Sequence, residues 1–119
     1  MLSGTELFVG AKKEGNFGTL VMCGLGGIFI EVLKDVQTGL APINKDEADR
    51  MIKQLRGYKI IKGTRGLQGI NEEIFNETIR RVSALCTAAP EIEEMDLNPL
   101  LGDANNVTAV DARIRIHKY

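Results

Sequence analysis

The sequence predicts a single α+β domain over residues 1–119, with a mixed or largely antiparallel sheet and helices packed on one face. Strand-like segments fill the first forty residues, two amphipathic helical patterns follow, and two further strand-like segments close the chain. Separate runs of strands and helices are typical of α+β domains, whereas parallel α/β folds alternate the two.

The first part of the chain carries four expected strands, at residues 6–11, 19–23, 28–33 and 37–43. The first alternates apolar and polar residues, as a half-buried strand does. The third is apolar on both faces, which is typical of a central strand covered on both sides. Glu31 is the exception in it, and a carboxylate among apolar neighbours indicates either a pocket or a sheet edge.

Two helices are expected next. Asn44 can cap the first, which has an apolar face and ends at Gly57. Residues 58–69 are rich in glycine and are expected to be irregular. Asn71 can cap a longer helix, whose apolar stripe ends at Pro90.

Strands at residues 92–98 and 107–116 close the chain around a polar loop. Alternation places Glu94, Asp96 and Asn98 on one face of the first strand. In the second strand Asp111, Arg113 and Arg115 share the polar face, and the apolar residues between them are expected to face the core. With a four-residue loop at 103–106, residues whose numbers sum to 209 lie opposite each other, so Asn98 faces Asp111.

This opposed pair has the chemistry of a magnesium site. Opposed side chains in a hairpin have Cβ atoms roughly 5 Å apart, so the amide oxygen of Asn98 and the carboxylate of Asp111 can reach one cation. Mg²⁺ takes few protein ligands and completes its shell with water and phosphate oxygens. Asp96 is the expected third ligand or holds a bound water. The alternative is a solvated polar face without a ligand.

Two further segments have alternative interpretations. Gly26 and Gly27 belong to a glycine-rich stretch whose backbone N–H groups can cradle a phosphate, or which forms only a tight turn. Arg65 lies between two glycines, as a phosphate-binding guanidinium or as a surface residue of a turn. His117 has no partner nearby in the sequence and is expected to be a frayed surface residue.

Composition excludes several functions. The 119 residues include 15 basic and 16 acidic side chains, so the net charge is −1. The chain therefore lacks the excess of positive charge that is typical of proteins that bind nucleic acid or an anionic membrane. No apolar run approaches the roughly 20 residues of a membrane span. Cys23 and Cys86 lie in apolar patterns without metal-ligand spacing, as core residues of a reduced protein do. These features indicate a cytoplasmic protein.

Five motifs in one order resemble a known family. They are GLGGIFIEVLKD at residues 24–35, AP at 41–42, GTRG at 63–66, EMDLNPL at 94–100 and VDAR at 110–113. Together with GTELFVG at 4–10 and NFG at 16–18, they resemble the C-terminal part of the ATP-grasp domain of ADP-forming acyl-CoA (acetyl-CoA) synthetases. These enzymes are relatives of the succinyl-CoA synthetase beta subunit.

The resemblance implies an ATP-grasp C-terminal subdomain of an acid–thiol ligase. Such an enzyme converts acyl-CoA, ADP and phosphate into acid, CoA and ATP through a phosphohistidine. Asn98 and Asp111 match the metal ligands of the family, and Asp96 falls where succinyl relatives have glutamate. Gly26, Gly27 and Glu31 match the strand and turn that line the nucleotide site, and Arg65 and Arg113 match positions on the phosphate side. The implied cofactors are Mg²⁺ and ATP or ADP, with CoA bound elsewhere.

The resemblance also implies missing parts. An N-terminal ATP-grasp subdomain and a CoA-binding domain or subunit are expected partners, and the chain alone is expected to be inactive. The alternative is a non-catalytic, truncated or regulatory synthetase-like module. Truncation would expose a sheet edge or an apolar patch, so self-association as a homodimer is expected.

Overall fold

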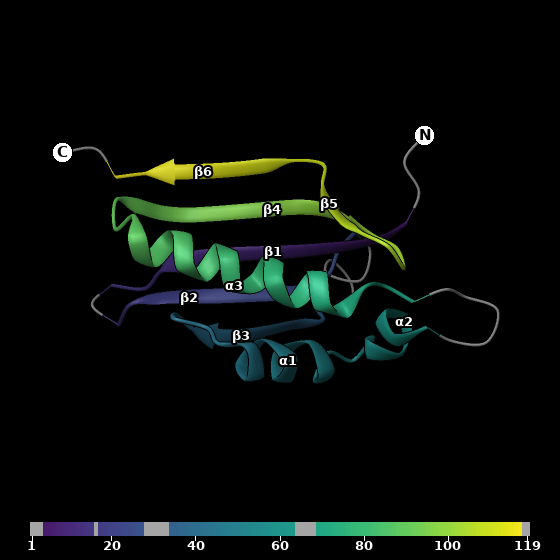
Figure 1. The fold of residues 1–119 in the computed structure, drawn as a ribbon. Helices are drawn as coiled ribbons and strands as arrows, with labels where there is room; N and C mark the ends of the chain where they lie inside the picture. Colours follow the sequence, from purple (N-terminus) through teal and green to yellow (C-terminus); the bar gives the residue numbers. More distant parts are fainter. Residues whose placement is uncertain (1–3, 16, 28–33, 64–68, 118–119) are drawn as a thin grey trace.

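The computed structural model describes residues 4–15, 17–27, 34–63 and 69–117, which form six strands and three helices (Figure 1). In chain order they are β1 Thr5–Lys13, β2 Thr19–Leu25, β3 Val36–Leu40, α1 Lys45–Lys53, α2 Tyr58–Lys62, α3 Glu72–Ala88, β4 Ile92–Gly102, β5 Val107–Ala109 and β6 Ala112–Ile116. The expected strand at 28–33 lies outside the described residues.

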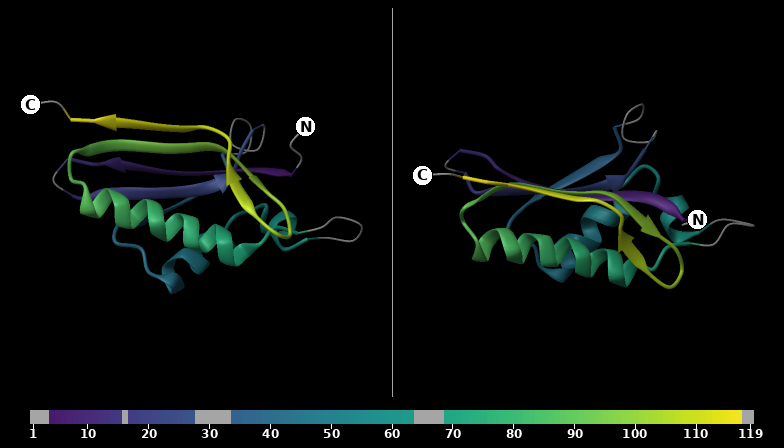
Figure 2. Two further views of the ribbon diagram at one scale, coloured as in Figure 1. Left: turned by 45° about the horizontal axis from the view of Figure 1, so that its top comes forward. Right: turned by 90° about the horizontal axis from the view of Figure 1, so that it is seen from above.

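The strands form one antiparallel sheet with the helices on one face, as predicted (Figure 2). The order is β3-β2-β1-β4, and β5 and β6 then pair in succession with the outer edge of β4. Alternate residues of β1, among them Leu7 and Val9, are completely buried on the helix side. The other residues of β1, such as Glu6 and Gly10, therefore lie on the opposite face of the sheet. This face is not covered by the helices and is called the open face below.

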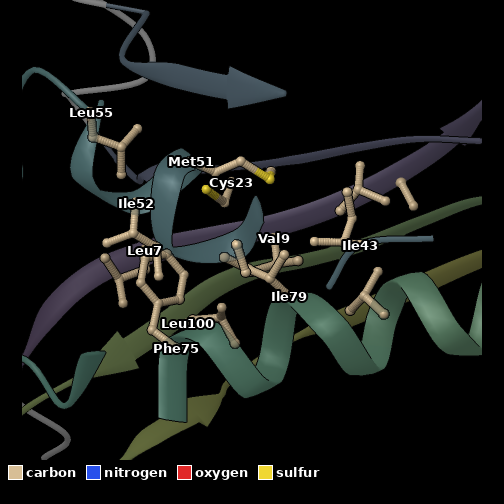
Figure 3. Packing of buried hydrophobic residues seen from close by; sticks show 14 of the residues in the cluster. Leu7, Val9, Cys23, Ile43, Met51, Ile52, Leu55, Phe75, Ile79 and Leu100 are labelled. Atoms are coloured by element: carbon tan, nitrogen blue, oxygen red, sulfur yellow. The ribbon is translucent and has the colours of Figure 1, made fainter. Parts of the chain in front are cut away.

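The two long helices begin at the predicted caps. The Asn44 side chain accepts a hydrogen bond from the backbone N–H of Glu47 at 2.8 Å, and Asn71 accepts one from Ile74 at 3.1 Å. These bonds satisfy N–H groups that have no partner within the helix. Phe75 and Ile79 of α3 pack with Met51 of α1 over the sheet, and all three are fully buried (Figure 3).

The expectation of an irregular segment at 58–69 is wrong for its first part, which forms α2. Gly57 precedes this helix, and the buried carboxylate of Asp35 accepts hydrogen bonds from the backbone N–H groups of Arg56 and Gly57, both at 2.7 Å. The side chain of Ile61 is fully buried in the core. Tertiary contacts thus stabilise a short helix that its own sequence does not predict.

The expected strand at 107–116 is divided into β5 and β6. Pro99 of β4 lies opposite the break and has no N–H to donate to a partner strand. Its carbonyl still accepts a hydrogen bond from the N–H of Val110 at 3.0 Å. β4 itself continues past the predicted end at Asn98 to Gly102.

The expectation that the apolar face of the last strand is buried is also wrong, because Val110, Ile114 and Ile116 are each about half exposed, at 49%, 49% and 54%. Both cysteines are unpaired and buried, as expected of core residues, and burial raises the pKa of Cys23 to about 12. In the part of the chain that the structure describes, no helix has the length and apolar character needed to cross a membrane.

Candidate functional site

The hairpin register predicted from the sequence is found on both sides of the candidate metal ligands. Leu100 pairs with Ala109 on one side, and Leu97 pairs with Ala112 on the other. Both pairs have residue numbers that sum to 209, so Asn98 lies across from Asp111 in the interval between β5 and β6. The Asp111 carboxylate accepts a hydrogen bond from the N–H of Ala112 at 2.9 Å, which holds it at the start of β6.

Asp103 fixes the loop that sets this register. Its carboxylate accepts hydrogen bonds from the N–H groups of Asn105 and Asn106, both at 2.8 Å. Its own N–H donates to the carbonyl of Asn106 at 2.9 Å, and its carbonyl accepts from the N–H of Asn71 at 2.8 Å. The loop is therefore closed on itself and attached to the beginning of α3.

The same bonds predict a pH dependence of stability. The N–H groups of Asn106 and Asn105 lower the pKa of Asp103 below its ordinary value of 3.8. Because the pKa is lower in the folded state, this stabilisation is complete above about pH 4 and is lost as the pH falls through the folded-state value. Asp103→Asn keeps the acceptor oxygen and does not titrate. Urea unfolding between pH 2.5 and 6 should therefore show a smaller acid-induced loss of stability in Asp103→Asn, and equal losses would contradict the assignment.

Asp96 lies next to the opposed pair on the open face of the sheet. It is directly opposite Arg113 across β4 and β6. Burial raises the pKa of Asp96 above its ordinary value, the positive charge of Arg113 opposes this rise, and the carboxylates of Glu94 and Asp111 add to it. Burial is thus the main cause of the shift and Arg113 is the opposing charge, while the two further carboxylates lie close enough to act on Asp96 and on a cation bound beside it.

A surface pocket of about 280 Å³ lies over this part of β4 and β6, and it is lined by Glu94, Asp96, Arg113, Ile114 and Arg115. Arg115 pairs with Glu94 at 3.0 Å, and Arg113 lies 3.8 Å from a carboxylate oxygen of Asp111. Carboxylates and guanidinium groups therefore alternate across the two strands. Such a surface can bind a metal ion and a phosphate together, because each finds groups of opposite charge.

The oxygen ligands suit magnesium chemically. Asn98, Asp111 and Asp96 supply amide and carboxylate oxygens, which are the donors that Mg²⁺ prefers. Among the residues with described positions, no three His, Cys, Asp or Glu side chains form a metal-binding group of their own. A metal at this site therefore needs the Asn98 amide and further ligands from water or phosphate. Mg²⁺ usually has one or two protein carboxylate ligands and completes its coordination in this way.

The Gly26–Gly27 turn follows β2 at the sheet and has the backbone of a tight turn. Gly27 has φ of +61°, and the N–H of Gly26 donates to the carbonyl of Glu6 at 2.8 Å. A side chain at Gly27 would overlap the carboxylate of Glu6. Glycine is thus favoured at position 27 by its positive φ, since the Glu6 side chain can move. β2 lies two strand positions from β4, roughly 10 Å away.

The sequence interpretation missed two residues around the site, Gly10 and Glu6. Gly10 lies between Met22 and Asp96 on the open face, and a Cβ there would approach the Met95 carbonyl to 3.3 Å. A glycine within a strand often marks a close approach by another backbone or by a ligand, and the close neighbour here is the Met95 carbonyl of β4. The position of Gly10 in β1 was the available signal. Glu6 gave no comparable signal. Glu31 and Arg65 lie outside the described residues.

The expectation that His117 is frayed is wrong. Its N–H donates to the carbonyl of Glu91 at 2.8 Å, and its Nδ1 lies 2.9 Å from a carboxylate oxygen of Glu93. These contacts attach the end of β6 to the beginning of β4. Neither His117 nor Glu93 lines the pocket beside Asp96.

Comparisons with known proteins agree on one family. A model of the ATP-grasp domain family matches residues 1–116. The chain is 43% identical over 111 residues to the subunit beta of acetate–CoA ligase [ADP-forming] I from Pyrococcus furiosus, covering 93% of this chain and 48% of the relative. It is 44% identical over 98 residues to 4-hydroxybutyrate–CoA ligase [ADP-forming] from Nitrosopumilus maritimus, covering 82% of this chain and 14% of the relative.

Solved structures extend the likeness to three dimensions. The chain superposes with a TM-score of 0.93 and 36% identity on the dinucleotide forming acetyl-coenzyme A synthetase 1 of Ca. Korarchaeum cryptofilum, in complex with coenzyme A and Mg-AMPPCP. This match covers 98% of the chain and 55% of the solved one. The chain thus spans about half the length, or less, of the relatives it matches.

Proposed function

This chain belongs to the ATP-grasp domain family, in the part found in ADP-forming acyl-CoA synthetases, and we propose that it supplies the Mg²⁺-nucleotide side of the cleft in such an enzyme. The observation that carries the proposal is the hairpin register, in which Asn98 lies across from Asp111. Asp96 and Arg113 lie beside them on the face of the sheet that the helices leave open.

The residues have distinct roles in this proposal. Asn98 and Asp111 bind Mg²⁺, and Asp96 is a third ligand or holds a bound water. Arg113 orients a phosphate through its planar guanidinium group. A Mg²⁺ ion held by these residues would supply positive charge to stabilise the phosphate groups. Phosphoryl transfer depends mainly on such positioning and electrostatic stabilisation.

Roles of the remaining candidates follow from the family. The Gly26–Gly27 turn and Glu31 line the nucleotide site, and Arg65 lies on its phosphate side. The Glu6 carboxylate against Gly27 favours a structural turn there over a phosphate cradle. The Mg-AMPPCP complex of the Korarchaeum relative supports ATP or ADP with Mg²⁺ as cofactors, and its coenzyme A supports a CoA site elsewhere.

The complete reaction needs further polypeptide. We assign to the whole synthetase the conversion of acyl-CoA, ADP and phosphate into acid, CoA and ATP. The N-terminal ATP-grasp subdomain and a CoA-binding domain or subunit are the proposed partners, because the relatives extend well beyond the matched region. Relatives named for acetate, 4-hydroxybutyrate and trans-feruloyl-CoA differ in their acids. We propose that parts outside this chain select the acid. The cytoplasm is the proposed compartment.

A complementation assay tests this function. The purified chain should form no ATP from acetyl-CoA, ADP and phosphate by itself, because the opposite wall of the cleft is absent. Mixing it with the remainder of the synthetase, produced as separate polypeptides, should restore ATP formation. Absence of ATP formation both in the mixture and in the undivided protein would favour a non-catalytic module.

A further inference from the structure

One residue at the beginning of α3 holds the metal hairpin, which consists of β4, β5 and the loop at 103–106. The backbone N–H of Asn71 donates to the carbonyl of Asp103 at 2.8 Å, and its side-chain amide donates to the carbonyl of Asn105 at 3.4 Å. The oxygen of the same side chain accepts the capping bond from Ile74. Figure 2 shows this loop beside the beginning of α3. Asn71 thus joins the helix to the hairpin loop through both ends of its amide group.

The end of β4 also packs directly against the residue that precedes Asn71. A Cβ on Gly102 would lie only 2.9 Å from the Cγ2 atom of Ile70, so the backbone of β4 and this side chain are in close contact. Ile70 is buried, and its N–H donates to the carbonyl of Ile61 in α2 at 2.8 Å. The beginning of α3 is therefore fixed in the core and can serve as a firm support for the hairpin loop.

The metal hairpin needs such a support because β5 is short and exposed. β5 has three residues, all of which pair with β4, and the side chains of Thr108 and Ala109 are exposed. Short strands with few buried contacts open more easily than the rest of a sheet. Asp111 follows β5 by two residues, so opening of β5 would free Asp111 to move away from Asn98.

We propose that Asn71 is a positioning residue for Mg²⁺ binding. By holding the loop at 103–106 it keeps β5 paired with β4, and so keeps Asp111 across from Asn98. This inference rests on the proposed function, because it takes Asn98 and Asp111 as the metal ligands. Three residue pairs of β4 and β5 separate the loop from these two residues, so Asn71 acts through the strands and not by contact with the ion. Its loss should raise the Mg²⁺ concentration that the enzyme needs without abolishing the reaction.

The substitution Asn71→Asp separates this role from helix capping. It keeps the cap on α3, since aspartate and asparagine cap helices equally well, but it places an oxygen instead of the amide N–H group against the carbonyl of Asn105. Asn44→Asp is the matched control, because Asn44 caps α1 in the same way and α3 lies between α1 and β5 in Figure 1. The added negative charge attracts cations, so the charge itself cannot raise the Mg²⁺ requirement.

Two measurements on the complete synthetase test the inference. In assays of ATP formation, Asn71→Asp should raise the Mg²⁺ concentration for half-maximal rate about threefold or more, since one hydrogen bond contributes a factor of about two to ten. The rate at saturating Mg²⁺ should stay close to that of the wild type. Hydrogen exchange of residues 101–110, measured by mass spectrometry without Mg²⁺, should become faster. Asn44→Asp should change neither quantity. If Asn71→Asp does not fold, Asn71→Ser decides, because serine also caps helices and lacks the amide N–H.

An unchanged Mg²⁺ requirement in Asn71→Asp would overturn the inference, whether or not hydrogen exchange becomes faster. A raised requirement with unchanged exchange would also overturn it, since Asn71 would then act without β5, and so would an equal rise in Asn44→Asp. Asp111→Ala, assayed alongside, separates this inference from the proposed function. If Asp111→Ala raises the Mg²⁺ requirement and Asn71→Asp does not, only the positioning role fails. If Asp111→Ala has no effect either, the metal assignment itself fails.

Discussion

Replacing Asp111 by alanine in the complete synthetase is expected to reduce ATP formation by about a hundredfold or more, since loss of one preorganised electrostatic group commonly costs that much. Asp111 supplies the one full negative charge of the opposed pair, and its position is fixed by the register of β4 with β5 and β6. The loss should be accompanied by a higher Mg²⁺ requirement in steady-state assays.

Asn98→Ala should act in the same direction with a smaller effect, because an amide oxygen carries no net charge. Asp46→Ala is a suitable control, as Asp46 is exposed in the first turn of α1, away from β4. Wild-type activity and an unchanged Mg²⁺ requirement in both site variants would remove Asn98 and Asp111 from the metal site.

Phe75→Ala is expected to lower the free energy of unfolding by about 3–5 kcal/mol, the usual cost of removing a buried aromatic ring and leaving a cavity. Phe75 is fully buried beneath α1 and against the sheet, in the centre of the core. For a chain of this size the loss is comparable to a large part of the total stability. Urea unfolding of the purified variant measures it directly.

Phe17→Ala provides the comparison for the same change of side chain. Phe17 is 84% exposed, so its removal should alter the free energy of unfolding by less than about 0.5 kcal/mol. A similar loss in both variants would mean that the core of the protein is not arranged around α3 as described.

The sequence predicted those parts of the fold that local chemistry controls. Asn44 and Asn71 cap their helices because their side chains accept bonds from the first turn. The hairpin register followed from the polar loop at 103–106. In contrast, α2 depends on Asp35, which lies more than twenty residues earlier in the chain and gives no local signal.

The site was predictable to a similar degree. Alternation placed Asp96 and Arg113 on the same face, and the structure pairs them across β4 and β6. The contact of Glu6 with the turn at Gly27 requires knowledge of how β1 and β2 pair. The exposure of Ile114 could not be predicted either, because an apolar face in a sequence does not reveal which element covers it.

The most direct test of the metal assignment is paramagnetic broadening by Mn²⁺, a substitute for Mg²⁺, in nuclear magnetic resonance spectra of the ¹⁵N-labelled chain with ADP. The account predicts that the amide signals of Asp96, Asn98 and Asp111 broaden at the lowest Mn²⁺ concentrations. The signals of Asp46 and Asp49 on α1 should remain sharp at those concentrations. Equal broadening at all of these positions, or broadening centred on α1, would contradict the assignment of Asn98 and Asp111 as the metal ligands.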